Sequence, residues 1–139
     1  MTGITVLAVV AVLALATGFW LRSRSGTVRA VRRTDSDDDA LRPLLLEAGV
    51  TTDTATVLHF SADWCGPCAA VRRVVGQVLT DRTGAREVEL DIDAHPDLAR
   101  ELGVLSLPTT FVLDADLRRR SRIAGVPSTA ALRSALDAL

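Results

Sequence analysis

A run of residues without any charged side chain opens the chain and limits what the remainder can fold into. It extends from Gly3 to Leu21 and reads GITVLAVVAVLALATGFWL. As an α-helix that rises ~1.5 Å per residue, this run would be about 28 Å long, which suits the hydrocarbon core of a bilayer. Phe19 and Trp20 stand where aromatic side chains favour the membrane interface. We therefore predict one N-terminal transmembrane helix within residues 1–21, so that a folded domain has to be built from later residues.

A cleaved signal peptide is the alternative explanation of the same run. Such a peptide begins with positive charge, has an apolar core of roughly 7–15 residues and ends in a small-residue cleavage site. Here no basic residue precedes the run, and the nearest cleavage-like triplet, Val28-Arg29-Ala30, contains an arginine. These features favour a retained anchor, with residues 3–21 in contact with lipid.

Basic residues on the carboxyl side of the run predict its orientation. They resist transfer across the membrane, and they comprise Arg22, Arg24, Arg29, Arg32 and Arg33. We therefore expect a single-pass protein of the cell membrane whose domain faces the cytoplasm. Residues 22–40 are rich in Arg, Ser and Asp and poor in apolar side chains, so we expect a juxtamembrane linker without packed structure.

The rest of the chain, residues 41–139, shows alternating strand and helix patterns. Apolar and β-branched runs bounded by turn residues predict strands over 56–60, 88–92, 109–113 and 117–124. Apolar residues at helical spacing predict helices over 40–48, 69–79, 96–102 and 128–138. This order predicts one α/β domain in which parallel strands give way to a hairpin. The formal net charge of −1 gives no reason to expect nucleic acid as a partner.

Two cysteines, Cys65 and Cys68, lie between a predicted strand and a predicted helix. The thiolate is the reactive form of cysteine, whereas an unperturbed thiol has a pKa of about 8.5 and is mostly protonated at neutral pH. Because Cys65 is expected to open the helix, unpaired N–H groups and the helix dipole would stabilise its thiolate. Pro67 suits the first helical turn, and Gly66 keeps the turn compact. The spacing places the cysteines about one helical turn apart, close enough for a disulfide.

Zinc sites use the same cysteine spacing, so the surroundings have to be considered. A structural zinc ion needs four ligands, and the sequence offers only His59 and His95 besides the cysteines. His59 lies in an apolar strand, and His95 precedes a proline at the start of a helix. We therefore expect neither a metal nor another cofactor.

The segment around the cysteines resembles the active site of the thioredoxin family. It reads Phe60-Ser61-Ala62-Asp63-Trp64-Cys65-Gly66-Pro67-Cys68, and Leu107-Pro108-Thr109-Thr110 resembles a second signature of the family. The resemblance covers roughly residues 41–139 and implies the thioredoxin fold, a central mixed β-sheet flanked by helices. It also implies a thiol-disulfide oxidoreductase in which Cys65 is the nucleophile and Cys68 the resolving cysteine.

The resemblance further implies a substrate-binding surface. Pro108 would be the family's cis-proline, which presents backbone to an extended substrate strand, and Gly125 would line the substrate groove. The full surface would comprise Trp64, Gly66, Pro67, Leu107, Pro108 and Gly125. The partners implied are disulfide-containing proteins and an upstream dithiol reductase, and we expect a monomer.

Several positions depart from the family pattern. His59 stands where the family has a buried aspartate beneath the second cysteine. A neutral imidazole could accept the proton of the resolving thiol, or His59 could be an ordinary buried residue. A lysine often accompanies that aspartate in the family; Glu89 stands near its position here, and the sequence explains no role for Glu89. Ser61 replaces an aromatic residue that the family commonly has before the motif. The run Arg118–Arg120 with Arg122 is interpreted as a solvated edge strand.

Three functional hypotheses follow. The Gly-Pro pair between the cysteines resembles that of the reducing thioredoxins, so we expect a dithiol reductant of protein disulfides near the membrane. A second hypothesis places the same domain outside the membrane, where it would reduce envelope or cytochrome thiols. A third is a non-catalytic binding module with this fold, which the presence of both cysteines and Pro108 disfavours.

Overall fold

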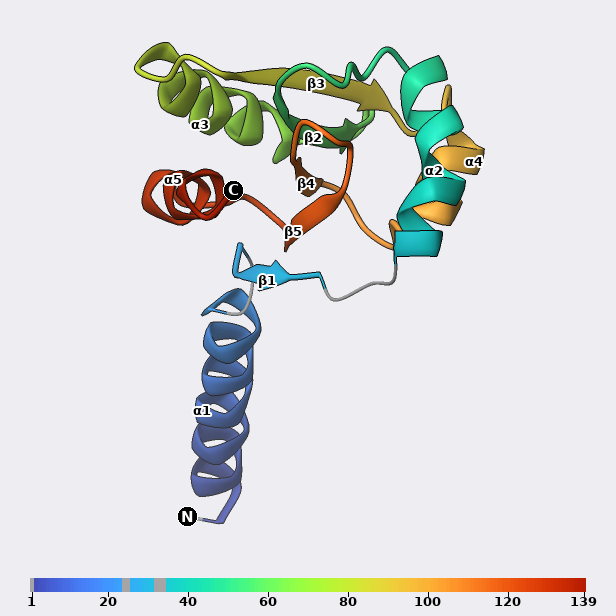
Figure 1. Cartoon of the computed structure of the whole chain (residues 1–139). Coiled ribbons are helices and arrows are strands. Elements are labelled where there is room, and N and C mark those ends of the chain that lie inside the picture. The colour runs from blue at the N-terminus through green and yellow to red at the C-terminus, as the bar shows by residue number, and fades with distance from the viewer. Residues whose placement is uncertain (1, 24–25, 32–34) are drawn as a thin grey trace.

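The computed structural model describes residues 2–23, 26–31 and 35–139 (Figure 1). Its first element is helix α1 (Thr2–Ser23), which extends away from the rest of the protein. The stretch Gly3–Trp20 has a mean hydropathy of 2.2 and no buried residue, and it is long and apolar enough to cross a membrane. These properties identify a helix that can enter a membrane, and a signal sequence has the same properties.

Five strands form one mixed sheet in the order β1-β5-β4-β2-β3. Strands β2 and β3 are parallel, and β4 and β5 form an antiparallel hairpin, as the sequence predicted. The pairs β2–β4 and β1–β5 are also antiparallel. The connection in the last hairpin is longer than predicted: β5 begins at Arg119 instead of Leu117, and Leu117 adopts a positive φ of 64° between the two strands. The strands are β1 (Val28–Ala30), β2 (Ala55–Ser61), β3 (Ala85–Asp91), β4 (Thr109–Leu113) and β5 (Arg119–Ala124).

Helices cover both faces of the sheet (Figure 1). Helices α3 (Cys68–Thr80) and α5 (Thr129–Asp137) lie on one face, and α2 (Asp35–Glu47) and α4 (Pro96–Glu101) lie on the other. Ser128 caps α5 by accepting a hydrogen bond of 3.1 Å from the N–H of Ala131, as its residue type predicts. The chain therefore forms an α/β sandwich of three layers.

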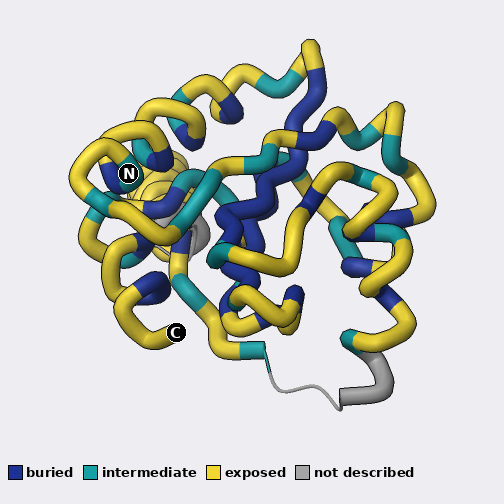
Figure 2. Tube along the Cα trace, turned by 45° about the horizontal axis from the view of Figure 1, so that its top comes forward, coloured by how far each residue is buried: buried dark blue, intermediate teal, exposed yellow. Residues whose placement is uncertain are grey.

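Each face of the sheet has its own hydrophobic core, and the buried segments run through the centre of the molecule in Figure 2. On the α2 and α4 face, the rings of Phe60 and Phe111 meet edge to face with centroids 6.5 Å apart. The core around them includes Leu41, Leu45, Leu58, Leu98, Leu113 and Leu117. The α3 and α5 face has a second core made mainly of smaller residues, including Val57, Val71, Val75, Val112, Ile123 and Leu132.

The prediction that residues 22–40 lack packed structure is wrong for the parts of this segment that the structure describes. Val28 pairs with Ile123, so that β1 adds to the sheet beside β5. Hydrogen bonds to an otherwise open strand edge compensate the cost of ordering this short segment. Helix α2 also begins at Asp35, before the predicted start at residue 40. Three of the five arginines used to predict orientation, Arg24, Arg32 and Arg33, lie outside the described residues.

The interpretation of the arginine run as an edge strand is also wrong. Strand β5 lies between β1 and β4. Arg119 is only 5% exposed, and its Nε donates a hydrogen bond of 2.9 Å to the Asp38 carboxylate on α2. This partly buried ion pair joins the start of α2 to the sheet.

Candidate redox site

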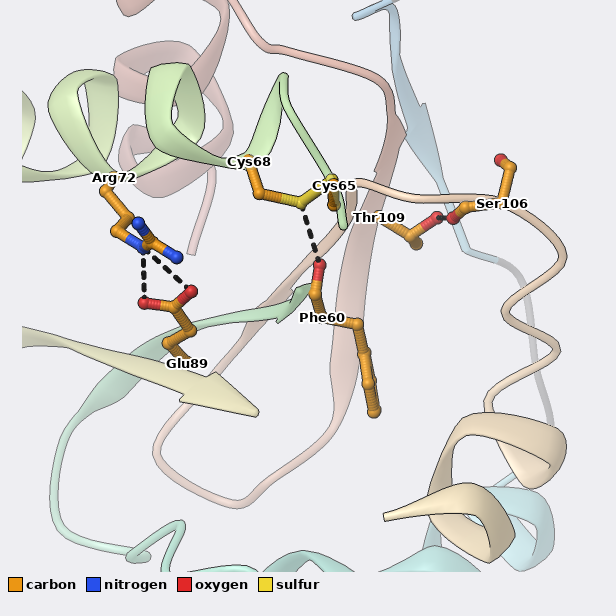
Figure 3. The surroundings of a disulfide bond; sticks show 7 residues. All are labelled: Phe60, Cys65, Cys68, Arg72, Glu89, Ser106 and Thr109. Atoms are coloured by element: carbon orange, nitrogen blue, oxygen red, sulfur yellow. Dashed lines mark hydrogen bonds and ion pairs between the residues drawn. A yellow bond between two sulfur atoms is a disulfide. The ribbon is translucent and has the colours of Figure 1, made fainter. Parts of the chain in front are cut away.

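The two cysteines are joined by a disulfide at the start of α3 (Figure 3). Strand β2 ends at Ser61, the chain turns through residues 62–67, and α3 begins at Cys68. The Cα atoms of Cys65 and Cys68 are 5.5 Å apart, about one helical turn, as the spacing predicted. Cys68 is fully buried, whereas Cys65 is partly exposed. Of the two cysteines, only Cys65 has atoms that another protein can reach.

The turn before α3 has its own hydrogen bonds. The N–H of Cys65 donates to the carbonyl of Ala62 over 3.0 Å, and the N–H of Cys68 donates to the carbonyl of Cys65 over 3.2 Å. Helix α3 therefore begins at Cys68 with Pro67 as its N-cap, later than the predicted start at Cys65. The Cys65 sulfur nevertheless lies at the N-terminus of α3, because it is bonded to the sulfur of the first helical residue.

A second loop lies beside the disulfide and ends in a cis proline. The Leu107–Pro108 peptide bond is cis, as the resemblance implied. The carbonyl of Pro108 accepts a hydrogen bond of 2.8 Å from the N–H of Gly125. Thr109 Oγ1 donates to the carbonyl of Ser106 over 2.7 Å, which fixes the loop next to Cys65 in Figure 3. The fold thus brings together the predicted residues of three separate segments.

Exposed apolar side chains lie on the segments around the disulfide. Trp64 is 72% exposed and directly precedes Cys65, and Leu105, in the cis-proline loop, is 91% exposed. Such side chains are suited to contact with another protein. The sequence predicted Trp64 but not Leu105; the available signal was an apolar residue in a loop between Gly103 and Pro108 that belongs to no periodic pattern.

Comparison with known proteins identifies this arrangement. The thioredoxin family model matches residues 45–138. The protein belongs to the thioredoxin family. A thioredoxin of Mycobacterium tuberculosis is 35% identical over 105 residues, which cover 71% of this chain and 89% of that protein. Oxidised mitochondrial thioredoxin 3 of Saccharomyces cerevisiae superposes with a TM-score of 0.58 at 26% identity, covering 71% of this chain and 90% of that one. A mutant thioredoxin of Halobacterium salinarum gives a TM-score of 0.57 at 26% identity, covering 78% of this chain and 86% of that one.

These matches make the chain a thiol-disulfide oxidoreductase with the thioredoxin fold. Thioredoxins act on disulfide-containing proteins, and Cys65 and Cys68 of this chain form a bonded pair with two residues between them. Among the described residues, no three side chains of His, Cys, Asp or Glu gather as a metal site would require.

In this thioredoxin-family protein a buried histidine lies on the strand that leads to the cysteines. His59 is fully buried on β2, and its Nε2 lies 2.8 Å from Oε1 of Glu87 on β3. A carboxylate only accepts hydrogen bonds, so Nε2 carries a hydrogen, and in a neutral imidazole the lone pair is then on Nδ1. Nδ1 is buried and has no hydrogen-bond partner in the described part of the chain. The Cys68 sulfur lies 4.0 Å from the carbonyl oxygen of Phe60, the residue after His59.

Glu89 forms a second charged pair in this region of the thioredoxin-family site. Nε of Arg72, one turn after Cys68 on α3, donates to both carboxylate oxygens of Glu89 over 2.8 Å (Figure 3). Burial raises the pKa of Glu89, but hydrogen bonds from Ser61 and Arg72 and nearby positive charge outweigh burial and lower it below its usual value. Glu89 lies opposite His59 in the sheet register.

The sequence alone missed Glu87 and Arg72. Glu87 contacts His59 only because β2 and β3 are parallel in a register that places Val57 opposite Glu87. Arg72 reaches Glu89 only when α3 packs across β3. Neither contact has a signature in sequence spacing, because both depend on how separate elements align.

Proposed function

We propose that this protein is a membrane-tethered dithiol reductant of protein disulfides, in which Cys65 attacks the substrate and Cys68 resolves the mixed disulfide. The observation that carries this proposal is the unequal burial of the two bonded cysteines. Cys68 is 0% exposed, and Cys65 is partly exposed. The outer sulfur can therefore meet a substrate disulfide, whereas the inner sulfur can reach only its partner.

The catalytic cycle moves two electrons and two protons. The thiolate of Cys65 attacks one sulfur of the substrate disulfide, and the other substrate sulfur leaves as a thiolate that takes up a proton. Cys68 then loses its proton and attacks the Cys65 sulfur, which releases the second substrate sulfur as a thiolate. The Cys65–Cys68 disulfide is the oxidised product, so each turnover requires an upstream dithiol reductase to return both electrons.

We assign proton transfer from the resolving thiol to His59. Its Nδ1 is buried and without a partner in the described residues, and its Nε2 is held by Glu87. The ring is therefore fixed with its acceptor nitrogen inside the protein, on a residue adjacent to the carbonyl that contacts Cys68. An imidazole is suited to this step near neutral pH.

The proposed substrate-binding surface surrounds the outer sulfur. Trp64 and Leu105 supply exposed apolar contacts, and Pro108 and Gly125 are joined by a hydrogen bond beside the cysteines. An extended substrate strand would lie along these two backbones. The surface comprises Trp64, Gly66, Pro67, Leu105, Leu107, Pro108 and Gly125.

We propose that electrons flow from the two cysteine thiols to the substrate disulfide, because the Gly-Pro pair between the cysteines resembles that of the reducing thioredoxins. The measurement that tests it is the reduction potential of the full chain in redox buffers. Oxidising family members begin above roughly −200 mV, so a potential well above that value would contradict the proposal.

The apolar helix α1 is proposed as the tether. Residues 1–21 form the anchor, and the thioredoxin-like domain, which includes β1 and the start of α2 as well as residues 41–139, faces the cytoplasm. A reporter fused after Leu139 tests the orientation. Activity of a reporter that requires export would instead place the domain outside the membrane, with envelope or cytochrome thiols as substrates.

Insulin reduction in the presence of dithiothreitol tests the enzyme itself. We expect the full chain to catalyse it, Cys65→Ser to abolish catalysis, and Cys68→Ser to trap a mixed disulfide with the substrate. The two variants are matched, because each removes one sulfur of the same bond. If the unaltered chain does not catalyse the reaction under any redox condition, the fold is serving as a binding module.

A further inference from the structure

The chain enters the sheet at the end that carries the redox site. The N–H of Gly26 donates a hydrogen bond of 2.7 Å to the carbonyl of Ala124, the last residue of β5. Ala124 lies opposite Thr109, and Thr109 lies opposite Phe60 near the end of β2. Figure 1 shows β1 between α1 and the remaining strands. The anchor and the disulfide therefore belong to the same end of the sheet.

Chain geometry limits the distance between them. Three strand spacings of ~4.8 Å separate Gly26 from Phe60, which is about 14 Å across the sheet. Ser23, the last residue of α1, precedes Gly26 by three positions, so their Cα atoms are no more than about 11 Å apart. The Cys68 sulfur is 4.0 Å from the carbonyl of Phe60. The disulfide consequently lies within about 30 Å of the end of α1.

The contact at Gly26 is specific to glycine. The residue is buried and adopts a φ of +78°, and a Cβ atom there would lie 2.3 Å from the carbonyl oxygen of Val126. A side chain at this position would clash with backbone, which cannot move aside as a flexible side chain can. The entry point of the domain is thus fixed against the loop that follows β5.

The proposed substrate surface lies on the anchor side of the cysteines. Pro108 precedes β4 and Gly125 follows β5, and in the order β1-β5-β4-β2 both strands stand between β1 and β2. A substrate strand that binds along Pro108 and Gly125 would therefore lie between Cys65 and the anchor.

The two edges of the sheet also differ in charge, and the edge next to the anchor is the more basic one. A hollow beside β1 is lined by Thr27, Arg29, Arg122 and Ala124, two of which carry guanidinium groups. The opposite edge is β3, which carries three carboxylates, on Glu87, Glu89 and Asp91, and one guanidinium group, on Arg86. Cations favour, and carboxylates disfavour, proximity to anionic lipid headgroups.

We infer that the protein reduces disulfides which other membrane proteins display close to the bilayer surface, because the fixed entry at Gly26 holds the substrate-binding side of its redox site towards the lipid headgroups. This inference rests on the proposed function, since it takes α1 as the anchor and Cys65 as the attacking residue. It adds the class of substrate: a disulfide borne by a membrane protein within a few tens of ångströms of the surface.

Two membrane-bound disulfide probes test it. Each is a transmembrane peptide that carries a hairpin closed by a disulfide. In the near probe, a spacer of about five residues joins the hairpin to the transmembrane segment. In the far probe, a helical spacer of about forty residues holds the hairpin ~60 Å from the surface. The full chain is reconstituted with each probe in liposomes that contain anionic lipid, reduced, and followed through a single turnover. We expect the near probe to be reduced at least about tenfold faster than the far probe, since tethering raises its effective concentration. In detergent, the two rates should become equal.

Two variants identify the role of the entry point. Gly26→Ala should reduce the preference for the near probe severalfold, because the added Cβ displaces the chain from Val126. Gly84→Ala is the matched control: Gly84 also has a positive φ, of +92°, but no atom lies within 4 Å of an added Cβ. Twenty flexible residues inserted before Gly26 should likewise raise the rate for the far probe, because such an insert spans roughly 25 Å on average.

The outcomes separate this inference from the function on which it rests. Equal rates for the two probes in liposomes, with insulin still reduced, would overturn the inference alone. A far probe that reacts faster would overturn it in the same way. Loss of activity on both probes and on insulin, or release of the chain from membranes by alkaline carbonate, would overturn the proposed function and the inference with it.

Discussion

The two faces of the sheet differ in what they bury. The face under α2 and α4 holds large apolar side chains, with Phe60 and Phe111 packed edge to face. Two buried polar side chains of this face, Thr56 and Arg119, lie at the end of the sheet away from the disulfide, beside Leu113. The face under α3 and α5 has a core of valines and also buries His59 and Thr110, which lie opposite each other on β2 and β4. Nδ1 of His59 and Oγ1 of Thr110 are buried without hydrogen-bond partners in the described residues.

This difference indicates a division of labour across one sheet. Burial of apolar surface is the main stabilising contribution to a fold, whereas a buried polar atom without a partner is destabilising. Buried groups without partners also gather where chemistry requires them. Because Cys68 opens α3, the polar face is the one that adjoins the disulfide. We therefore expect substitutions on the apolar face to change stability and substitutions on the polar face to change the rate of thiol exchange.

The largest effect is expected for Phe111→Ala. Loss of this fully buried ring should lower the free energy of unfolding by about 3–5 kcal/mol, from lost transfer energy and an incompletely filled cavity. Denaturant titration of the full chain measures it, with Leu46→Ala on the exposed side of α2 as a control that changes stability by less than about 0.5 kcal/mol. If Phe111→Ala also slowed thiol exchange per folded molecule, the two faces would not differ in role as we expect.

His59→Ala tests the polar face. Removal of a proton acceptor should slow resolution of the mixed disulfide about a hundredfold, measured as single-turnover release of substrate. His95→Ala is the matched control, because His95 lies at the start of α4 and its side chain makes no capping hydrogen bond. His59→Asp, which restores the residue type of the family, should recover much of the rate. An unchanged rate in His59→Ala would mean that this histidine is structural only.

Glu87→Ala sharpens the same comparison. Without the carboxylate that fixes the Nε2 hydrogen, the imidazole could turn or change tautomer, so we expect resolution to slow by about two- to tenfold. Imidazole NMR shifts should report the tautomer directly. The control is Glu101→Gln, at an exposed position of α4. If Glu87→Ala proves as slow as His59→Ala, the pair would act as one unit.

The smallest effect is expected for Glu89→Gln, through pH. The folded pKa of Glu89 lies below its usual value of 4.5, so its ion pair with Arg72 stabilises the fold above that pH and loses its contribution as the pH falls through the folded value. Because the pair is partly solvated, the difference should be below about 1 kcal/mol at neutral pH. Denaturant titrations at pH 7 and pH 3 should show that the variant differs from the unaltered chain more at pH 7 than at pH 3.

The sequence predicted most of the domain because its elements have strong local patterns. Strand β4 agrees in both bounds, and Ser128 caps α5 as a serine before a helix should. Strand β1 could not be predicted in the same way. Val28-Arg29-Ala30 is too short to show alternation, and its pairing with β5 depends on an edge that exists only after the rest of the sheet has formed.

The residues of the redox site also differ in whether local sequence patterns predict them. The cysteines and Pro108 were predictable, because their chemistry and conformation are encoded within a few consecutive residues. Glu87 and Arg72 were not, since each acquires its partner through packing between elements. Leu105 falls between these cases: its residue type is visible in the sequence, but its exposure is not.

The pairing of Val28 with Ile123 joins residues that are synthesised at opposite ends of the chain. As the nascent polypeptide leaves the ribosome, α1 emerges first and can enter the bilayer while β5 is still inside the exit tunnel. Strand β1 then has to wait, next to the proposed anchor, until translation is almost finished. The segment that joins the proposed anchor to the domain is therefore made early and is among the last to adopt its final place.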